Sequence, residues 1–308
     1  MTWLLWRQHR LQAAVAGAAM AALAVLLWIT GVHMADAYRA CRASATCSGS
    51  TLFQGQGYGP LQNLVTLTLA VPLLLGVLWA APLIGREFET GTHTLAWTQS
   101  VTRRHWLTSK LVVLIGGTVA CSAALTGVVT WWSGTLNSLH GNRFDGARFD
   151  TQGVLPIAYS LFAVSLGVAA GAALRRLLPA LGVTIFGFVA VRILVEGYVR
   201  PLFQHPLVAT FRLDQNDPIS SGAWVISQTV TLNGHEVSNA VQGPGPCAGT
   251  GSRSQMDTCM SDLGYRMVTK YQPANRYWPF QFIESAIFVG LAAVLIAVCV
   301  IVVRRRDA

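Results

Sequence analysis

Charged residues are scarce in this sequence. Asp, Glu, Lys and Arg together make up only 11% of its 308 residues, whereas 53% of the residues are hydrophobic. Soluble domains carry about 25% charged residues, so this composition excludes an ordinary soluble protein. The mean hydropathy of +0.47 instead indicates a protein of the lipid bilayer.

The sequence also lacks the motifs of a membrane-embedded enzyme. It has no G-x-x-x-x-G-K-[ST] phosphate loop and no H-E-x-x-H zinc motif, so the residues offer no ATPase or metalloprotease site of those kinds. The seven histidines are dispersed, and no His or Asp falls inside an apolar run where a catalytic cluster would be needed. A polytopic membrane enzyme and a membrane sensor protein therefore stay as alternative functions only.

Six apolar runs are long enough to cross about 30 Å of hydrocarbon as helices. Because lipid offers no hydrogen-bond partner to the backbone, helices are the expected structure of such runs. The expected fold is therefore an all-α polytopic membrane protein, a single transmembrane domain over residues 1–308. The predicted spans are 11–32, 64–84, 111–132, 154–174, 177–199 and 281–303.

The distribution of positive charge predicts the orientation of these spans. If both termini are cytoplasmic, the inside segments hold eleven of the 22 Lys and Arg residues, and the two short outside loops hold only four. This bias follows the positive-inside rule and predicts a multi-pass protein of the plasma membrane. The net charge of +9 is then a topology signal, and no nucleic-acid partner is expected.

Four of the six cysteines fall in the predicted outside loops. Cys41 and Cys47 lie in the first loop, and Cys247 and Cys259 lie in a long loop over residues 200–280. Because disulfides persist in oxidising compartments, we expect each loop to contain one disulfide. A zinc site is a weaker alternative, since neither pair has histidines at ligand spacing. The long loop is expected to form a compact extracellular cap, with a hairpin cue at the Asn-Gly that ends residues 224–234.

Residues 85–110 are polar and charged, although they lie between the second and third apolar runs. They begin with the pattern E-x-E-x-G-T, formed by Glu87, Glu89, Gly91 and Thr92. Gly91 is suited to the left-handed conformation that ends a helix, and Thr92 can cap a short helix after it. A short, rigid and polar segment joined to two membrane helices has the form of a docking surface, although a merely solvated loop is the alternative.

This segment and the six-span topology resemble the permease subunits of type-2 ATP-binding-cassette exporters. In that family an E-x-E-x-G-T-like motif precedes a coupling helix between spans two and three. The chain has Ser100 where many members have Pro, and its 20 Arg against two Lys are typical of an actinobacterial source. The positions that match the family's pattern are Glu87, Glu89, Gly91, Thr92, Leu95, Val101, Thr102, Arg103 and Lys110. The resemblance implies that ATPase coupling involves Glu87, Glu89, Gly91, Thr92, Leu95, Arg103 and the neighbouring Arg104.

The resemblance implies a function that depends on another protein. A cytosolic ATPase subunit carrying ATP and Mg would bind residues 86–103. Two permease copies, expected to form a homodimer, would export an amphiphilic small molecule, lipid or peptide. No cofactor is expected on this chain, and ATP hydrolysis is expected on the separate subunit.

Three ionisable residues lie within the predicted spans: Arg192 and Glu196 in the fifth and Glu284 in the sixth. Such groups are costly in hydrocarbon and normally face protein or water. Two interpretations stay open at this stage. These residues either line the translocation path or form an ion pair that ties the fifth and sixth helices together.

Overall fold

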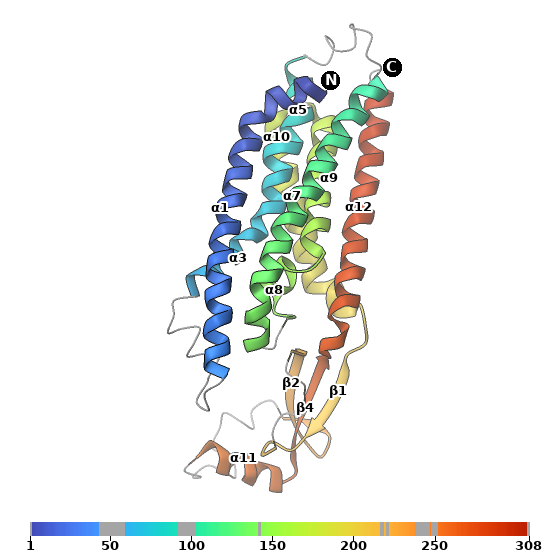
Figure 1. The fold of residues 1–308 in the computed structure, drawn as a ribbon. Coiled ribbons are helices and arrows are strands. Elements are labelled where there is room, and N and C mark those ends of the chain that lie inside the picture. The colour runs from blue at the N-terminus through green and yellow to red at the C-terminus, as the bar shows by residue number, and fades with distance from the viewer. Residues whose placement is uncertain are drawn as a thin grey trace. The chain divides into compact units, whose positions relative to one another are not determined.

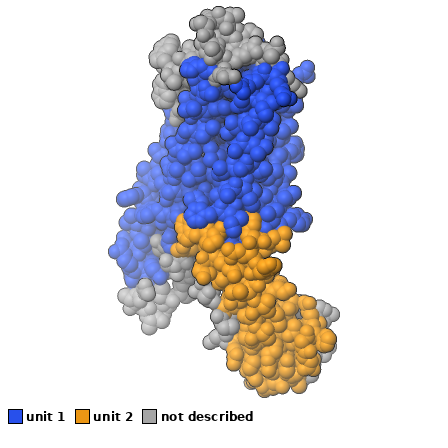
Figure 2. All heavy atoms as spheres, turned by 90° about the vertical axis from the view of Figure 1, so that its right-hand side faces the viewer, with its two compact units in different colours: residues 1–139, 146–200, 280–308 blue, residues 140–145, 201–279 orange. Residues whose placement is uncertain are grey.

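The computed structural model describes residues 2–42, 59–91, 103–140, 143–215, 219, 222–237, 247 and 252–306. The chain divides into two compact units, which Figure 2 colours separately. Unit 1 comprises residues 1–139, 146–200 and 280–308, and unit 2 comprises residues 140–145 and 201–279. Unit 1 is helical, whereas unit 2 contains all the strands among the described residues.

Unit 1 contains six helical segments that are long and apolar enough to cross a membrane. Three of the six consist of several consecutive elements. The first three segments are formed by α1 (Thr2–Arg42), by α3 (Gly59–Leu67) with η1 (Thr68–Ala70), α4 (Val71–Leu75), η2 (Gly76–Ala80) and α5 (Ala81–Glu89), and by α7 (Arg103–His140). The last three are formed by α9 (Leu155–Leu174), by α10 (Leu177–Leu194) with η3 (Val195–Val199) and η4 (Arg200–Leu202), and by η5 (Ala274–Arg276) with α12 (Tyr277–Arg306).

The boundaries of these segments differ from the predicted ones at several ends. The first extends over Gly17–Cys41 and the fifth over Leu177–Leu202, beyond the predicted ends at 32 and 199. Both extensions contain charged residues, which hydropathy assigns to loops although they continue the helix. In Figure 1, the N-terminal turns of α1 and the C-terminal end of α12 lie at the same end of the bundle as the end of α5 and the start of α7.

The centre of unit 1 is α9, in which 72% of the most apolar stretch is buried, against 33% or less in the other segments. The second segment packs against α9 through glycines that allow backbone contact. A Cβ atom on Gly76 would lie 2.6 Å from the carbonyl oxygen of Ala163, and one on Gly167 would lie 2.7 Å from the carbonyl oxygen of Gly76. Small residues of this kind let membrane helices approach closely.

The second segment is not a regular α-helix throughout. Its η2 part is a π-helical turn that ends just before α5, where Pro82 follows Ala81. Proline has no N–H for the carbonyl four residues earlier, and such breaks are commonly accommodated by local π or 3₁₀ turns. A short helix, α8 (Gly146–Thr151), precedes α9 and places Asp150 inside unit 1.

Unit 2 corrects the prediction of an all-α fold. It contains a four-stranded antiparallel sheet in the order β1-β4-β2-β3, formed by β1 (Leu207–Phe211), β2 (Trp224–Leu232), β3 (His235–Glu236) and β4 (Tyr265–Gln272). The expected hairpin is present, since Leu232 pairs with His235 and the turn residues Asn233 and Gly234 have φ of 51° and 83°. The central strand β4 is not predicted from the sequence because its partners are distant along the chain.

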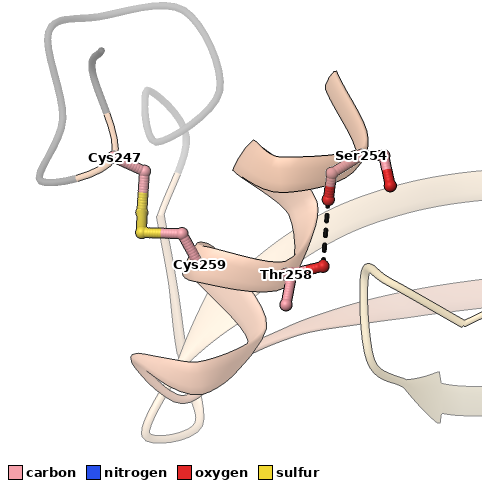
Figure 3. Close-up of a disulfide and its surroundings, with 4 residues drawn as sticks. All are labelled: Cys247, Ser254, Thr258 and Cys259. Atoms are coloured by element: carbon pink, nitrogen blue, oxygen red, sulfur yellow. Dashed lines mark hydrogen bonds between the residues drawn. A yellow bond between two sulfur atoms is a disulfide. The ribbon is translucent and has the colours of Figure 1, made fainter. Parts of the chain in front are cut away.

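A disulfide joins Cys247 and Cys259, the two cysteines of this loop that we expect to pair (Figure 3). Cys259 lies in α11 (Arg253–Asp262), whose N-cap Ser252 accepts a hydrogen bond from the Gln255 N–H. In the same helix the Thr258 hydroxyl donates to the Ser254 carbonyl at 3.0 Å (Figure 3). Cys41 is also disulfide-bonded, while its expected partner Cys47 lies outside the described residues.

Candidate functional site

The first candidate site is the end of α5, where the E-x-E-x-G-T pattern begins. Gly91 has φ of 71°, so it adopts the left-handed conformation expected at the end of this helix. Thr90 closes the last turn, since its N–H and its hydroxyl both donate to the Arg86 carbonyl, at 2.9 Å and 2.8 Å. Thr92 and Leu95 lie outside the described residues, as do the side chains of Arg103 and Arg104.

The two acidic residues of the pattern contact other helices of this chain. Glu87 forms an ion pair with Lys110 of α7. Glu89 accepts a hydrogen bond from the backbone N–H of Leu177, the first residue of α10, at 3.0 Å. The cap residue of α10, Arg176, makes no side-chain cap hydrogen bond, so Glu89 provides the capping acceptor from a distant part of the sequence.

Aromatic side chains surround these polar contacts. Phe88 packs edge-to-face against Trp106 of α7, with ring centroids 6.3 Å apart, and the Arg175 guanidinium lies 5.1 Å from the Phe88 ring. The Lys110 ammonium group lies 4.3 Å from the Trp106 ring centroid, and the Lys110 side chain is only 4% exposed. We call this set, Glu87, Phe88, Glu89, Trp106, Lys110, Arg175 and Leu177, the elbow seat.

The second candidate site is a buried ion cluster in unit 1. Arg200 donates to both carboxylate oxygens of Glu284, at 2.7 Å and 2.9 Å, and to Asp150 at 2.6 Å. Arg192 donates to the other oxygen of Asp150 at 2.5 Å. Glu284 and Asp150 are nearly inaccessible, at 0% and 2% exposure, so these carboxylates depend on their partners for charge compensation.

Tyr159 of α9 completes the cluster. Its hydroxyl lies 2.6 Å from Glu284 and 3.1 Å from Asp150, and its single proton can be donated to only one of them at a time. The Arg192 guanidinium lies 4.7 Å from the Tyr159 ring centroid. Five side chains from α8, α9, α10, η4 and α12 therefore meet in one network.

The structure assigns different partners from those that the sequence indicates. Arg192, Glu196 and Glu284 all belong to this region, but Glu284 pairs with Arg200, and Arg192 pairs with Asp150. Glu196 is 42% exposed and lies 3.9 Å from Arg200. Asp150 and Arg200 are not predicted from the sequence, because hydropathy assigns both to loops. A signal is present in each case, since both are charged residues that closely flank an apolar run.

The polar interior leaves little free volume beside this cluster. A cavity of about 10 Å³ is lined by side chains that include Thr68, Ser122, Thr126, Asp150 and Tyr159. This volume holds about one water molecule. The buried Thr126 hydroxyl has no hydrogen-bond partner among the described residues, which fits a bound water at this position.

Within the described ranges, no group of three or more His, Cys, Asp or Glu residues is arranged to hold a metal ion. In the ion cluster, Arg200 bridges Asp150 and Glu284 and Arg192 binds Asp150, while Cys247 and Cys259 are joined in a disulfide.

A bundle of six membrane-length helices with a compact polar turn at one end of its second segment is the architecture of a polytopic membrane protein. A family model described as ABC-2 membrane transporter related matches residues 17–200. The chain belongs to this family, and it is therefore a permease-type membrane subunit, a component that is not itself catalytic. No curated protein and no solved structure matches the chain.

Proposed function

We propose that this chain is the permease of an ATP-binding-cassette exporter in the plasma membrane, driven by a separate ATPase subunit that docks on residues 86–103. Members of the ABC-2 permease family normally work with an ATPase subunit. The observation that carries the proposal is the elbow seat, which fixes the start of this segment against three other spans. Because residues 86–103 are fixed to these spans at their start, a force applied to them by a cytosolic protein can be transmitted to the helical bundle.

The proposal includes a homodimer with both termini in the cytoplasm. ATP and Mg would be bound by the ATPase subunit, and this chain would supply the docking segment and the translocation path of the exported molecule. The exported molecule is proposed to be an amphiphilic small molecule, a lipid or a peptide. The side chains buried in unit 1 are predominantly apolar, which supports an amphiphilic cargo, because a strongly polar one would require many more polar contacts.

The test of docking uses the chain co-expressed with a cassette-type ATPase subunit, for which the adjacent gene is the first candidate. Replacing residues 93–101 by a Gly-Ser segment of equal length is expected to abolish co-purification of the ATPase. A matched control, Thr258→Ala in α11 of unit 2, is expected to leave it unchanged. Co-purification that survives the replacement, or labelling that places residues 86–103 outside the cell, would overturn the proposal.

We also propose that the ion cluster has a structural role and does not line the translocation path. Its carboxylates are fully engaged by Arg192, Arg200 and Tyr159, and the adjoining cavity of about 10 Å³ is too small for a substrate. Glu284→Gln is therefore expected to reduce the amount of assembled protein while the export rate per assembled complex stays unchanged. If Glu284→Gln instead lowers the export rate per assembled complex while the amount of assembled protein stays normal, the ion cluster has a role in the translocation path.

A further inference from the structure

The carboxylates of the E-x-E pattern have partners within this chain. Glu87 and Glu89 lie on the last turn of α5, two residues apart, so their side chains leave the helix in different directions. One reaches Lys110 on α7, and the other reaches Leu177 at the start of α10. The pattern thus joins the second segment to two others at the point where the docking segment begins.

The contact with α10 is supported by the packing beneath it. A Cβ atom on Gly85 would lie 3.6 Å from the Cα of Gly171 and 3.8 Å from the Cα of Leu177, so α5 lies directly against the turn between α9 and α10. A Cβ atom on Gly171 would lie 3.0 Å from the Gly85 nitrogen. The hydrogen bond from Leu177 to Glu89 therefore closes an interface that is already at backbone contact.

The electrostatics of this contact favour a carboxylate at position 89. The first N–H groups of a helix have no acceptor within the helix, and the positive end of the helix dipole favours a nearby negative charge. Arg175 adds a second contact between α5 and the same turn through the Phe88 ring. Arg175 is held in the left-handed conformation, with φ of 53°, at the end of α9.

We propose that Glu87 and Glu89 are positioning residues, which lock the end of α5 to α7 and to the α9–α10 turn so that these helices move with the docking segment. This inference rests on the proposed function, because it names the contacts through which a movement of residues 86–103 is transmitted to the other helices. It also distinguishes these carboxylates from contact residues for the ATPase. The two roles predict different responses to an amide at position 89.

Glu89→Gln keeps an oxygen that can accept the Leu177 N–H, whereas Glu89→Ala removes the acceptor. In the complex with its ATPase in proteoliposomes, Glu89→Ala is expected to lower ATP-dependent export about three- to tenfold, and Glu89→Gln is expected to retain most of it. Co-purification of the ATPase is expected to stay within about twofold of wild type for both. Glu236→Ala, at an exposed acid of β3, is the matched control.

The second arm tests the ion pair with Lys110. Glu87→Lys and Lys110→Glu are each expected to uncouple ATP hydrolysis from export, because each single change places like charges together. The double variant Glu87→Lys/Lys110→Glu restores opposite charges and is expected to recover part of the export. Absence of any recovery, with the double variant assembled normally, would remove Glu87 from the proposal.

A third measurement does not involve the ATPase. Hydrogen exchange of the Leu177 amide in the permease alone is expected to accelerate about three- to tenfold in Glu89→Ala and much less in Glu89→Gln. If wild-type protein binds no ATPase, the proposed function fails while this exchange result still reports on the contact. If Glu89→Ala leaves the exchange unchanged, or if Glu89→Gln and Glu89→Ala lose ATPase binding alike, the positioning role is overturned.

Discussion

Arg200 is the side chain on which the buried ion cluster depends most. It makes four of the hydrogen bonds of the cluster: two to Glu284, one to Asp150 and one, at 3.3 Å, with the Tyr159 hydroxyl. Arg200→Met keeps most of the apolar stem and removes every one of these bonds. Among the described residues, Glu284, at 0% exposure, would then keep only its contact with Tyr159, and the two buried carboxylates would be left with one guanidinium, that of Arg192, which binds Asp150.

Removing one partner of a buried ion pair costs about 3–5 kcal/mol, because it leaves an uncompensated buried charge. We expect Arg200→Met to lower the free energy of unfolding by this amount. The double variant Arg200→Met/Glu284→Gln leaves Asp150 and Arg192 as a balanced pair, so we expect it to be less destabilised than Arg200→Met alone. A coupling free energy of about 1–3 kcal/mol between the two positions would be typical of residues in one network.

The measurement is equilibrium unfolding of the purified protein in mixed micelles, with the free energy of unfolding compared among wild type, both single variants and the double variant. Arg39→Met provides the control, because the Arg39–Asp36 pair is exposed, at 74% and 59%, and such pairs contribute little. A loss below about 1 kcal/mol for Arg200→Met, or strict additivity in the double variant, would refute the account of the cluster.

Three further outcomes follow from packing, the disulfide and charge. Gly76→Ala is expected to destabilise unit 1 by about 1–3 kcal/mol, because its Cβ would meet the Ala163 backbone, whereas Gly116→Ala, with nothing within 4 Å, is expected to be tolerated in the same thermal melt. Cys247→Ser/Cys259→Ser opens a loop of sequence separation 12 and is expected to cost unit 2 about 3 kcal/mol, seen as faster hydrogen exchange in α11 and β4, with unit 1 unchanged. The hydrogen bond from Arg212 lowers the pKa of Asp214 from 3.8 to about 2, so its stabilising contribution is complete above about pH 4 and is lost as the pH falls through 2. Exchange of the Asp214 amide, which donates to the Ser261 hydroxyl, is expected to show this dependence, and Arg212→Met is expected to move it to higher pH.

The sequence predicts the helical part of the fold well because the bilayer constrains it strongly. Six spans follow from run length alone, and the left-handed Gly91 and the Asn233-Gly234 turn follow from local conformational preferences. These features depend on residues that are close together in the chain. They need no knowledge of which segments meet in space.

The parts that the sequence does not predict depend on distant contacts. β4 pairs with both β1 and β2, and that register cannot be found from one strand. Arg200 and Glu284 are 84 positions apart, and hydropathy gives no indication that they meet. The intramolecular partners of Glu87 and Glu89 are likewise hidden, because a polar pattern between two spans indicates solvent or a partner protein equally well.

The Arg200–Glu284 bond lies where the chain leaves unit 1 and where it returns. Residues 201–279 are therefore inserted between Arg200 and the start of the segment that contains Glu284, and the Arg200 Nε–Glu284 Oε2 hydrogen bond of 2.7 Å joins these two ends within unit 1. The matched family region also ends at residue 200, just before this insertion. Because unit 1 holds the two ends of this insertion together with its own side chains, replacing residues 201–279 by a short linker is expected to leave the helical bundle able to fold.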